Sequence, residues 1–399
     1  MDYIAEWLNL LVRWLHLITG IAWIGSSFYF VWLDNHLKPP ADKSNPRIFG
    51  EVWSVHGGGF YHNQKYLQGP AQLPEELHWF KWEAYFTWMS GISMLAIVYW
   101  WGAEAYLIDK QVLDITPGVA ILSSIALLAG AWLVYDRLCK TYLVEDGLSF
   151  ALLGFVLVVI TAFLLTKLYS GRGAYIHVGA MLGTIMVANV FFVIIPGQRK
   201  MVEAIKAGQA PDPRFGKWGK QRSVHNNYMT LPVLFIMISN HYPMTYGNAY
   251  SWAVLAAMIV AGVLIRHFFN LRHKGRVVWA LPAAAAVIIA GLAAVIAPRS
   301  QTYVPLKPYT AEQLAFQHIQ PIIAERCAGC HAAKPTIDGF AAPPAGVMLQ
   351  TPDQIRRWSQ RILDVAVINQ IMPAGNLTEM TDGERDLLGA WIAAGAKVQ

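Results

Sequence analysis

The chain has 399 residues, of which 55% are hydrophobic and only 14% are charged. Soluble domains carry about 25% charged residues, so this composition excludes an ordinary soluble protein and favours a membrane protein. The net charge is +6, but the basic residues are not interleaved along one face, which argues against a nucleic-acid-binding protein.

Hydrophobic stretches dominate the first three quarters of the chain. A helix needs about 20 apolar residues to cross a hydrocarbon core of ~30 Å, and eight stretches approach this length. They are 8–33, 84–101, 117–135, 148–166, 174–195, 224–242, 249–265 and 277–297. We therefore expect an all-α fold: a polytopic bundle of about eight transmembrane helices in residues 1–297, followed by a small helical domain in residues 298–399.

Lysine and arginine residues fall mainly in alternate connections between these stretches. The first, third, fifth and seventh connections hold 18 of them, whereas the N-terminus and the other connections hold 3. Positive residues stay in the cytoplasm, so both termini and the C-terminal domain are expected on the opposite side of the membrane. The connection at 196–223 contributes most of the positive charge.

The first connection, residues 34–83, is expected in the cytoplasm and is unusually long. Within it, residues 51–55 and 60–67 could pair as a β-hairpin around Gly57-Gly58-Gly59. Long loops without regular structure are usually functional or disordered, and the many His, Trp and Tyr residues here argue against disorder.

The C-terminal domain contains Cys327-Ala-Gly-Cys330-His331, the attachment signature of a c-type haem. Two thiols one helical turn apart add to the haem vinyl groups, and the adjacent imidazole then reaches the iron. A zinc site would need a second ligand pair, and this part of the chain offers only His318. A thioredoxin-like dithiol would need a βαβ frame, which is not predicted. We expect one covalent haem c.

The second axial ligand of the iron should come from a loop further along the chain, because Met with His is the usual pair in cytochromes c. Met372 is the best candidate, since Pro373 restricts the chain beside it and Gly375 permits a tight turn. The competitors, Met348 and Met380, fit better as side chains that fill gaps in the core.

Three capping boxes predict helix starts in this domain. They are Thr310 with Gln313, Thr351 with Gln354, and Thr381 with Glu384. The expected helices precede the haem signature, separate the two axial ligands and end the chain, and the last presents Leu387, Leu388 and Trp391 to the first. Over about 95 residues this arrangement resembles a class I cytochrome c, whose haem is attached outside the cytoplasm.

Polar residues inside apolar spans are costly and are therefore candidates for function. Arg13 and His16 lie one helical turn apart and share a face, while His177 and His241 lie in the outer parts of the fifth and sixth spans. We expect that His16, His177 and His241 could converge near the haem domain as a second centre, a b-type haem or a metal. Alternatively, each histidine only hydrogen-bonds between helices.

Two local motifs stand out in the first part of the chain. They are Arg13-Trp14-Leu15-His16 followed by Ile21-Ala-Trp23-Ile24-Gly25-Ser-Ser-Phe28-Tyr29-Phe30, and His56-Gly57-Gly58-Gly59-Phe60-Tyr61. With the eight spans and the cytochrome c tail, they resemble the membrane-bound urate hydroxylase family, the cytochrome c-linked urate oxidases of bacterial purine catabolism. The resemblance covers nearly the full chain, and much of it is the order of the domains.

The resemblance implies that the protein oxidises urate to 5-hydroxyisourate with oxygen from water, in the bacterial inner membrane. The haem domain would then be periplasmic, and a soluble cytochrome c or a terminal oxidase would accept the electrons. Because one c haem holds one electron and urate releases two, either the haem discharges twice or a second centre exists. The alternative is a non-catalytic subunit that relays electrons from quinol or a dehydrogenase.

The resemblance assigns no catalytic residues, so candidates follow from the chemistry. Urate is a planar anion that needs cationic or N–H donors, stacking rings and a base to activate water. Arg13 could supply the charge, Trp14, Trp23 or Phe60 the stacking, and His16 or His177 the base.

Overall fold

A computed structural model describes residues 2–67, 69–297, 303–337 and 342–398. The described chain is mostly helical, as expected, with a single small sheet of two strands. Its hydrophobic side chains form one large core within residues 92–263 and a separate core within residues 303–398. We refer to residues 2–297 as the N-terminal bundle and to residues 303–398 as the C-terminal segment.

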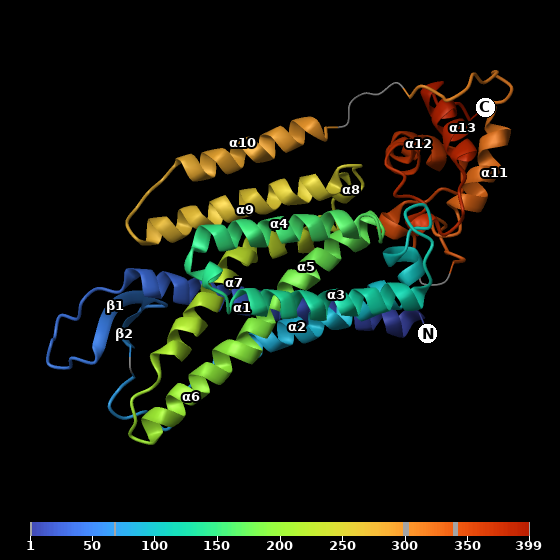
Figure 1. Ribbon diagram of the computed structural model, residues 1–399. Coiled ribbons are helices and arrows are strands. Elements are labelled where there is room, and N and C mark those ends of the chain that lie inside the picture. The colour runs from blue at the N-terminus through green and yellow to red at the C-terminus, as the bar shows by residue number, and fades with distance from the viewer. Residues whose placement is uncertain (1, 68, 298–302, 338–341, 399) are drawn as a thin grey trace.

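The N-terminal bundle consists of elongated helices that run between two ends (Figure 1). Its helices are α1 (Asp2–His36), α2 (Trp82–Leu95), α3 (Pro117–Leu138), α4 (Gly147–Leu165), α5 (Gly171–Ala188), α6 (Ile195–Lys206), α7 (Pro213–Ser239), α8 (Pro243–Tyr246), α9 (Ser251–His273) and α10 (Ala280–Val295). Between them lie three short π-helical segments, η1 (Ala96–Trp100), η2 (Ala103–Leu107) and η4 (Asn189–Ile194), and the 3-10 helix η3 (Tyr142–Glu145). Each of the eight predicted spans falls largely on one or two of these elements.

Five helical stretches of the described chain are long and apolar enough to cross a membrane. They are Trp7–His36, Pro117–Leu138, Gly147–Leu165, Gly171–Lys206 and Ser251–His273, and Ala280–Val295 is a shorter apolar helix. By this criterion of length and composition, eight membrane crossings stay a prediction.

The predicted hairpin is confirmed. Strand β1 (Ile48–His56) pairs antiparallel with β2 (Gly59–Tyr66), and His56 lies opposite Gly59. Gly57 and Gly58 have φ angles of 57° and 81°, which two-residue hairpin turns require and which glycine adopts without strain. The hairpin and α6 lie at the end of the bundle opposite the C-terminal segment (Figure 1).

The connection at 196–223 is not a loop. The structure places α6 and the first turns of α7 there, and the side chain of Asp212 caps α7 by accepting a hydrogen bond from the backbone N–H of Arg214. Two arginines that the charge count treated as loop residues, Arg222 and Arg266, are buried inside α7 and α9. A count of charges between apolar stretches does not distinguish such buried arginines from the exposed Lys and Arg residues that indicate the cytoplasmic side of a membrane.

The C-terminal segment contains α11 (Phe316–Arg326), α12 (Pro352–Ile362) and α13 (Asp382–Ala393), with short turns η5 (Pro344–Gly346), η6 (Leu363–Ile368) and η7 (Ala374–Asn376). The capping boxes of Thr351 and Thr381 are confirmed. Thr310 also exchanges hydrogen bonds with Gln313, but a turn follows it and α11 begins only at Phe316. As expected, the last helix packs on the first, with the rings of Phe316 and Trp391 6.0 Å apart.

Close packing of α5 on α7 offers a test of the bundle. A Cβ atom added at Gly179 would lie 2.6 Å from Cγ2 of Ile236, whereas one added at Gly183, on the same helix, would meet nothing within 4 Å. We expect Gly179→Ala to destabilise the fold by about 1–3 kcal/mol through overpacking. Gly183→Ala should be neutral or stabilising by up to about 1 kcal/mol.

Thermal unfolding of the two purified variants in detergent measures this difference. Equal unfolding midpoints for the two variants would contradict the close contact between α5 and α7.

Candidate functional site

The Cys327–His331 motif forms a turn that directly continues α11. The backbone N–H of Cys327 donates to Ile323 O at 2.9 Å, and that of His331 donates to Cys327 O at 2.9 Å. The ring atom Nδ1 of His331 lies 3.0 Å from the carbonyl oxygen of Val347. Since a carbonyl only accepts, Nδ1 carries the proton and Nε2 is the nitrogen that can bind a metal.

The two cysteines of this turn are free thiols. Burial raises the pKa of the Cys327 thiol to about 12. Cys327 and Met372 pack against the same hydrophobic core, and Met380, 1% exposed, belongs to that core as expected. Two free thiols, an imidazole with an available Nε2 and a thioether fit a covalently attached haem.

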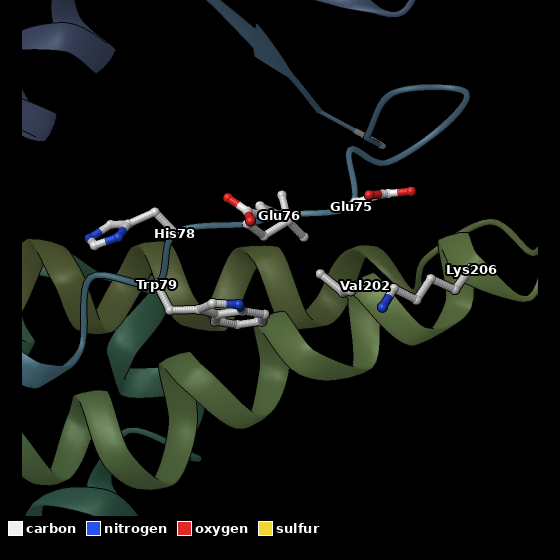
Figure 2. Close-up of a pocket in the computed structure, with 7 residues that line it drawn as sticks. Glu75, Glu76, His78, Trp79, Val202 and Lys206 are labelled. Carbon is white, nitrogen blue, oxygen red and sulfur yellow. The ribbon is translucent and has the colours of Figure 1, made fainter.

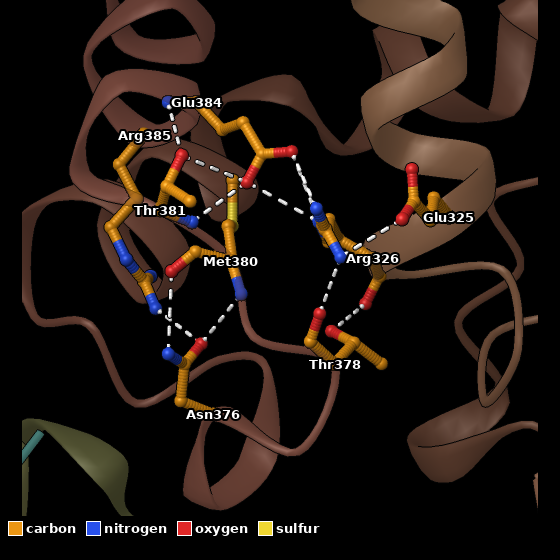
Figure 3. A network of polar contacts seen from close by, with 8 residues as sticks. All are labelled: Glu325, Arg326, Asn376, Thr378, Met380, Thr381, Glu384 and Arg385. Atoms are coloured by element: carbon orange, nitrogen blue, oxygen red, sulfur yellow. Dashed lines mark hydrogen bonds and ion pairs between the residues drawn. The ribbon is translucent and has the colours of Figure 1, made fainter. Parts of the chain in front are cut away.

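Arg385 holds the loop that carries Met372, and sequence analysis did not find it. Its side chain is 2% exposed, and its guanidinium donates to the carbonyl oxygens of Ala366 and Met372 and to Oδ1 of Asn376. Oδ1 of Asn376 also accepts the backbone N–H of Met380 at 3.1 Å (Figure 3). A signal for Arg385 exists in the sequence, because it lies three residues before Leu388 on the buried face of α13.

A second arginine joins α11 to α13. Arg326 pairs with the carboxylate of Glu384 at 3.0 Å and donates to the carbonyl oxygen of Thr378 at 2.7 Å (Figure 3). The hydroxyl of Thr378 donates back to the carbonyl oxygen of Arg326 at 2.9 Å. The chain between Met372 and α13 is therefore fixed at both of its ends.

The N-terminal bundle contributes a group of arginine and tyrosine side chains at the end that faces the C-terminal segment. Oδ1 of Asn240 accepts hydrogen bonds from the hydroxyl of Tyr99 at 3.0 Å and from Nε of Arg172 at 3.3 Å. The guanidinium of Arg172 lies 5.0 Å from the ring centroid of Tyr106 and 5.8 Å from that of Tyr99. These are cation–π distances.

Arg13 of α1 belongs to the same group. It interacts electrostatically with Arg172, Tyr99 and Tyr106, and its Nε donates to Oδ1 of Asn9 at 2.7 Å. Tyr106 is on η2, which contacts η7 of the C-terminal segment. We call Arg13, Tyr99, Tyr106, Arg172 and Asn240 the arginine–tyrosine cluster. It lies at the end of the bundle that contacts the C-terminal segment.

The arginine–tyrosine cluster carries two positive charges without a described acidic partner. No salt bridge of Arg13 or Arg172 with a carboxylate is present in the parts of the chain that the structure describes. Two guanidinium groups that lie close together repel each other, and a bound anion would relieve this repulsion. The cluster is therefore a candidate anion-binding site.

The three histidines expected to form a second centre are not brought together. His177 is 0% exposed, and both of its ring nitrogens are engaged, Nε2 with Ser124 Oγ and Nδ1 with Gly173 O, each at 2.7 Å. His16 binds α2 through Nδ1, which lies 2.9 Å from Thr87 O, and His241 is exposed beyond the end of α7. Over residues 2–67, 69–297, 303–337 and 342–398, no three His, Cys, Asp or Glu side chains form a metal-binding group.

These features were compared with known proteins. A family model described as "Urate oxidase N-terminal" matches residues 2–297. The chain belongs to this family. No curated protein and no solved structure matched the chain. The region matched by the urate oxidase model contains the whole arginine–tyrosine cluster, whereas the Cys327–His331 turn lies beyond it.

The described surface of this urate oxidase family member contains cavities, two of which are defined by their lining residues. The larger, of about 500 Å³, lies between residues 75–79 and α6 and is lined by Glu75, Glu76, Leu77, His78, Trp79, Val202 and Lys206 (Figure 2). Its acidic and basic groups are mixed, and none of them belongs to the arginine–tyrosine cluster. The smaller, of about 330 Å³, lies where Glu104 and Ile108 meet Gly375 and Leu377, at the junction of the bundle with the C-terminal segment.

Removal of the Arg385 guanidinium should loosen the Met372 loop. We expect Arg385→Met to leave buried carbonyl groups without donors and to destabilise the C-terminal segment by about 2–4 kcal/mol. Arg356→Met, at an exposed position of α12, should change stability by less than about 0.5 kcal/mol.

Hydrogen–deuterium exchange of the backbone amides around residues 365–376 reads this effect locally. Unchanged exchange there in Arg385→Met would show that the guanidinium does not hold the loop.

Proposed function

We propose that the protein is a membrane-bound urate oxidase that converts urate to 5-hydroxyisourate and delivers the electrons to a covalently bound c-type haem. One observation carries the proposal: two guanidinium groups of the family-matched bundle without a described acidic partner, flanked by tyrosine rings, lie at the end of the bundle where η2 contacts the C-terminal segment that bears the haem attachment motif. In this proposal an anion site lies next to an electron acceptor.

The arginine–tyrosine cluster suits the urate anion. Urate is planar, and its oxygen and nitrogen atoms accept hydrogen bonds in the plane of the ring. A guanidinium group recognises such an edge with two parallel N–H bonds. Arg172 is oriented by Asn240 and by the ring of Tyr106, and Arg13 approaches the same place from α1.

The reaction requires water and a base. Urate and one water molecule give 5-hydroxyisourate, two protons and two electrons, with the water oxygen added at C5. A base must accept a proton from the water as the bond forms. We assign this role to His16, which lies on the face of α1 that carries Arg13 and which uses Nδ1 to bind Thr87 O, so that Nε2 can accept the proton.

His177 serves a different purpose in this proposal. Because both its nitrogens are hydrogen-bonded, it cannot accept a proton from water without breaking a contact. Its ring meets the ring of Tyr99 edge-on at 6.1 Å. His177 is therefore a positioning residue for Tyr99.

Four residues of the C-terminal segment would hold the haem. Cys327 and Cys330 would form the thioether links, and His331 and Met372 would bind the iron, supplying a one-electron acceptor beside the arginine–tyrosine cluster. Urate yields two electrons, so a soluble cytochrome c or a terminal oxidase would discharge this acceptor twice per turnover. A b-type haem or metal in the bundle is the alternative second acceptor.

We further propose that the bundle spans the bacterial inner membrane, with the C-terminal segment periplasmic and the hairpin cytoplasmic. Five apolar helices of sufficient length support the lipid contact. The hairpin and the C-terminal segment lie at opposite ends of the bundle (Figure 1), and the excess of Lys and Arg in the connections on the hairpin side agrees with this orientation.

Substitution of the two arginines tests the substrate site. We expect Arg172→Gln and Arg13→Gln each to raise the KM for urate by roughly 10- to 150-fold, the equivalent of a hydrogen bond to a charged group. Arg276→Gln, which removes an exposed charge near the other end of the bundle, should leave KM unchanged.

The measurement follows haem reduction by urate in the purified full-length protein. Reduction by quinol but not by urate would contradict the proposal and favour an electron-relay subunit. His16→Gln should lower kcat and remove the fall in kcat that protonation of the base causes on acidification, whereas retained kcat and pH profile would exclude His16 as the base.

The haem ligands have their own test. We expect Cys327→Ala with Cys330→Ala to abolish the covalent haem, because the thioether links need both thiols. Met372→Ala should keep the covalent haem but change its absorption and lower its reduction potential, because a thioether ligand raises the potential, whereas Met348→Ala should change neither. Pyridine haemochrome spectra and redox titration measure these effects, and a colourless wild-type protein would refute the haem.

A further inference from the structure

A third arginine without a described acidic partner lies at the hairpin end of the bundle. Arg266 of α9 is 4% exposed, and its Nε donates to Oδ1 of Asn227 at 2.5 Å. Its guanidinium carbon lies 3.8 Å from the ring centroid of Phe28. Its Nη2 is buried and has no hydrogen-bond partner within the described chain.

Another buried arginine of the bundle, Arg222, has the acidic partner that Arg266 lacks. Arg222, 3% exposed, forms a salt bridge with Asp136 at 2.8 Å and donates to Asn189. No carboxylate of the described residues pairs with Arg266. An unpaired buried charge destabilises a fold by several kcal/mol. Packing alone therefore does not explain why the bundle contains Arg266.

The groups around Arg266 are neutral or basic. Asn227 donates to Asn270 at 3.2 Å, and the hydroxyl of Tyr228 lies 2.7 Å from Nδ1 of His267. His273, two turns further along α9 than Arg266, also has a buried Nδ1 without a partner among the described residues. Nη2 of Arg266 and Nδ1 of His273 are both buried without a hydrogen-bond partner in the described chain, and no described carboxylate pairs with Arg266. These conditions favour the binding of an anion.

We propose that Arg266, Asn227 and Phe28 form a second anion-binding site, for a small planar organic anion with two coplanar acceptor atoms. Phe28 covers one face of the guanidinium and Asn227 occupies its Nε. Nη2 is covered and has no hydrogen-bond partner within the described chain, so a ligand would reach it in the plane of the group by displacing the side chains that cover it. A carboxylate and the urate anion share this chemistry.

This site is separate from the arginine–tyrosine cluster. Phe28 and Arg13 are both on α1 and are fifteen residues apart, which corresponds to about 22 Å at 1.5 Å per residue. If urate is the occupant, a point that rests on the proposed function, the site gives substrate a binding place at the end opposite to the haem motif. Each end of the bundle would then have an anion site built around an arginine.

Binding stoichiometry in the full-length, haem-loaded protein tests the proposal. Equilibrium dialysis with radiolabelled urate should give two urate molecules per chain for the wild type and one each for Arg266→Met and Arg172→Gln. The double variant should bind none. Arg272→Gln, an exposed arginine of the same helix, is the matched control and should bind two.

Benzoate, a planar carboxylate, identifies the class of ligand. It should raise the unfolding midpoint of Arg172→Gln, in which only the Arg266 site is intact, and should have no effect on the double variant. If urate has this effect and benzoate does not, the site is specific for the purine anion.

Stability separates binding from a structural role. In the absence of ligand, Arg266→Met should unfold no earlier than the wild type, because an uncompensated buried charge is replaced by an apolar side chain of similar volume. Arg266→Lys, which keeps the charge but not the planar fork, should bind at least about tenfold more weakly. An early-unfolding Arg266→Met together with an unweakened Arg266→Lys would overturn the proposal.

Two urate molecules bound to Arg266→Met would also overturn it. The proposed function has an independent readout, since Arg266→Met should still show haem reduction by urate in detergent, where both ends are open to substrate. Suppose that Arg266→Met binds one urate molecule fewer than the wild type, but that urate does not reduce the haem of either protein. This result would support the Arg266 site and refute the oxidase.

Discussion

The contact between η2 of the bundle and η7 of the C-terminal segment determines how the two parts can work together. A Cβ atom at Gly375, where φ is 57°, would lie 2.5 Å from the carbonyl oxygen of Glu104 and 2.7 Å from that of Ile108. Only glycine fits a backbone approach this close. The ion pair of Lys110 with Glu379 at 3.1 Å lies beside it. This contact places Tyr106, near the end of η2, at the junction of the bundle with the C-terminal segment.

Four arginine side chains of this protein fall into two classes. Arg222 and Arg326 are paired with carboxylates, and each joins helices that are distant in the sequence. Within the described chain, Arg172 and Arg266 pair with no carboxylate and contact amides and aromatic rings. An amide and a ring can orient a guanidinium but cannot neutralise it, so these two residues keep the capacity to bind an anion. The side chains that the fold brings next to each arginine decide to which class it belongs, and the sequence alone does not show them.

Much of the fold followed from the sequence because its determinants are local. Apolar stretches, the two central glycines of the hairpin and the Thr351 and Thr381 capping boxes each act within a few residues, and the structure confirms the elements that they predict. Thr310 shows the limit of such signals, since its reciprocal hydrogen bonds form without a helix directly after it.

The candidate site depended on contacts between distant segments, and the sequence predicted less of it. Arg13 and His16 were identified because both stand inside an apolar stretch. Arg172 and Arg266 were read as connection charges, since whether an arginine near a helix end faces solvent or the bundle is decided by the neighbouring helices. The two hydrogen bonds that engage His177 come from Ser124 and Gly173, and only the fold brings Ser124 there.

The loop between Met372 and Asn376 is shared by two neighbours. Arg385 ties its beginning and its end to α13, while Gly375, between these ties, rests on the backbone of η2. The loop is too short to yield at one contact and stay fixed at the other. A displacement of η2, which bears Tyr106, is therefore transmitted to Met372, so the position of this proposed haem ligand depends on the conformation of the bundle.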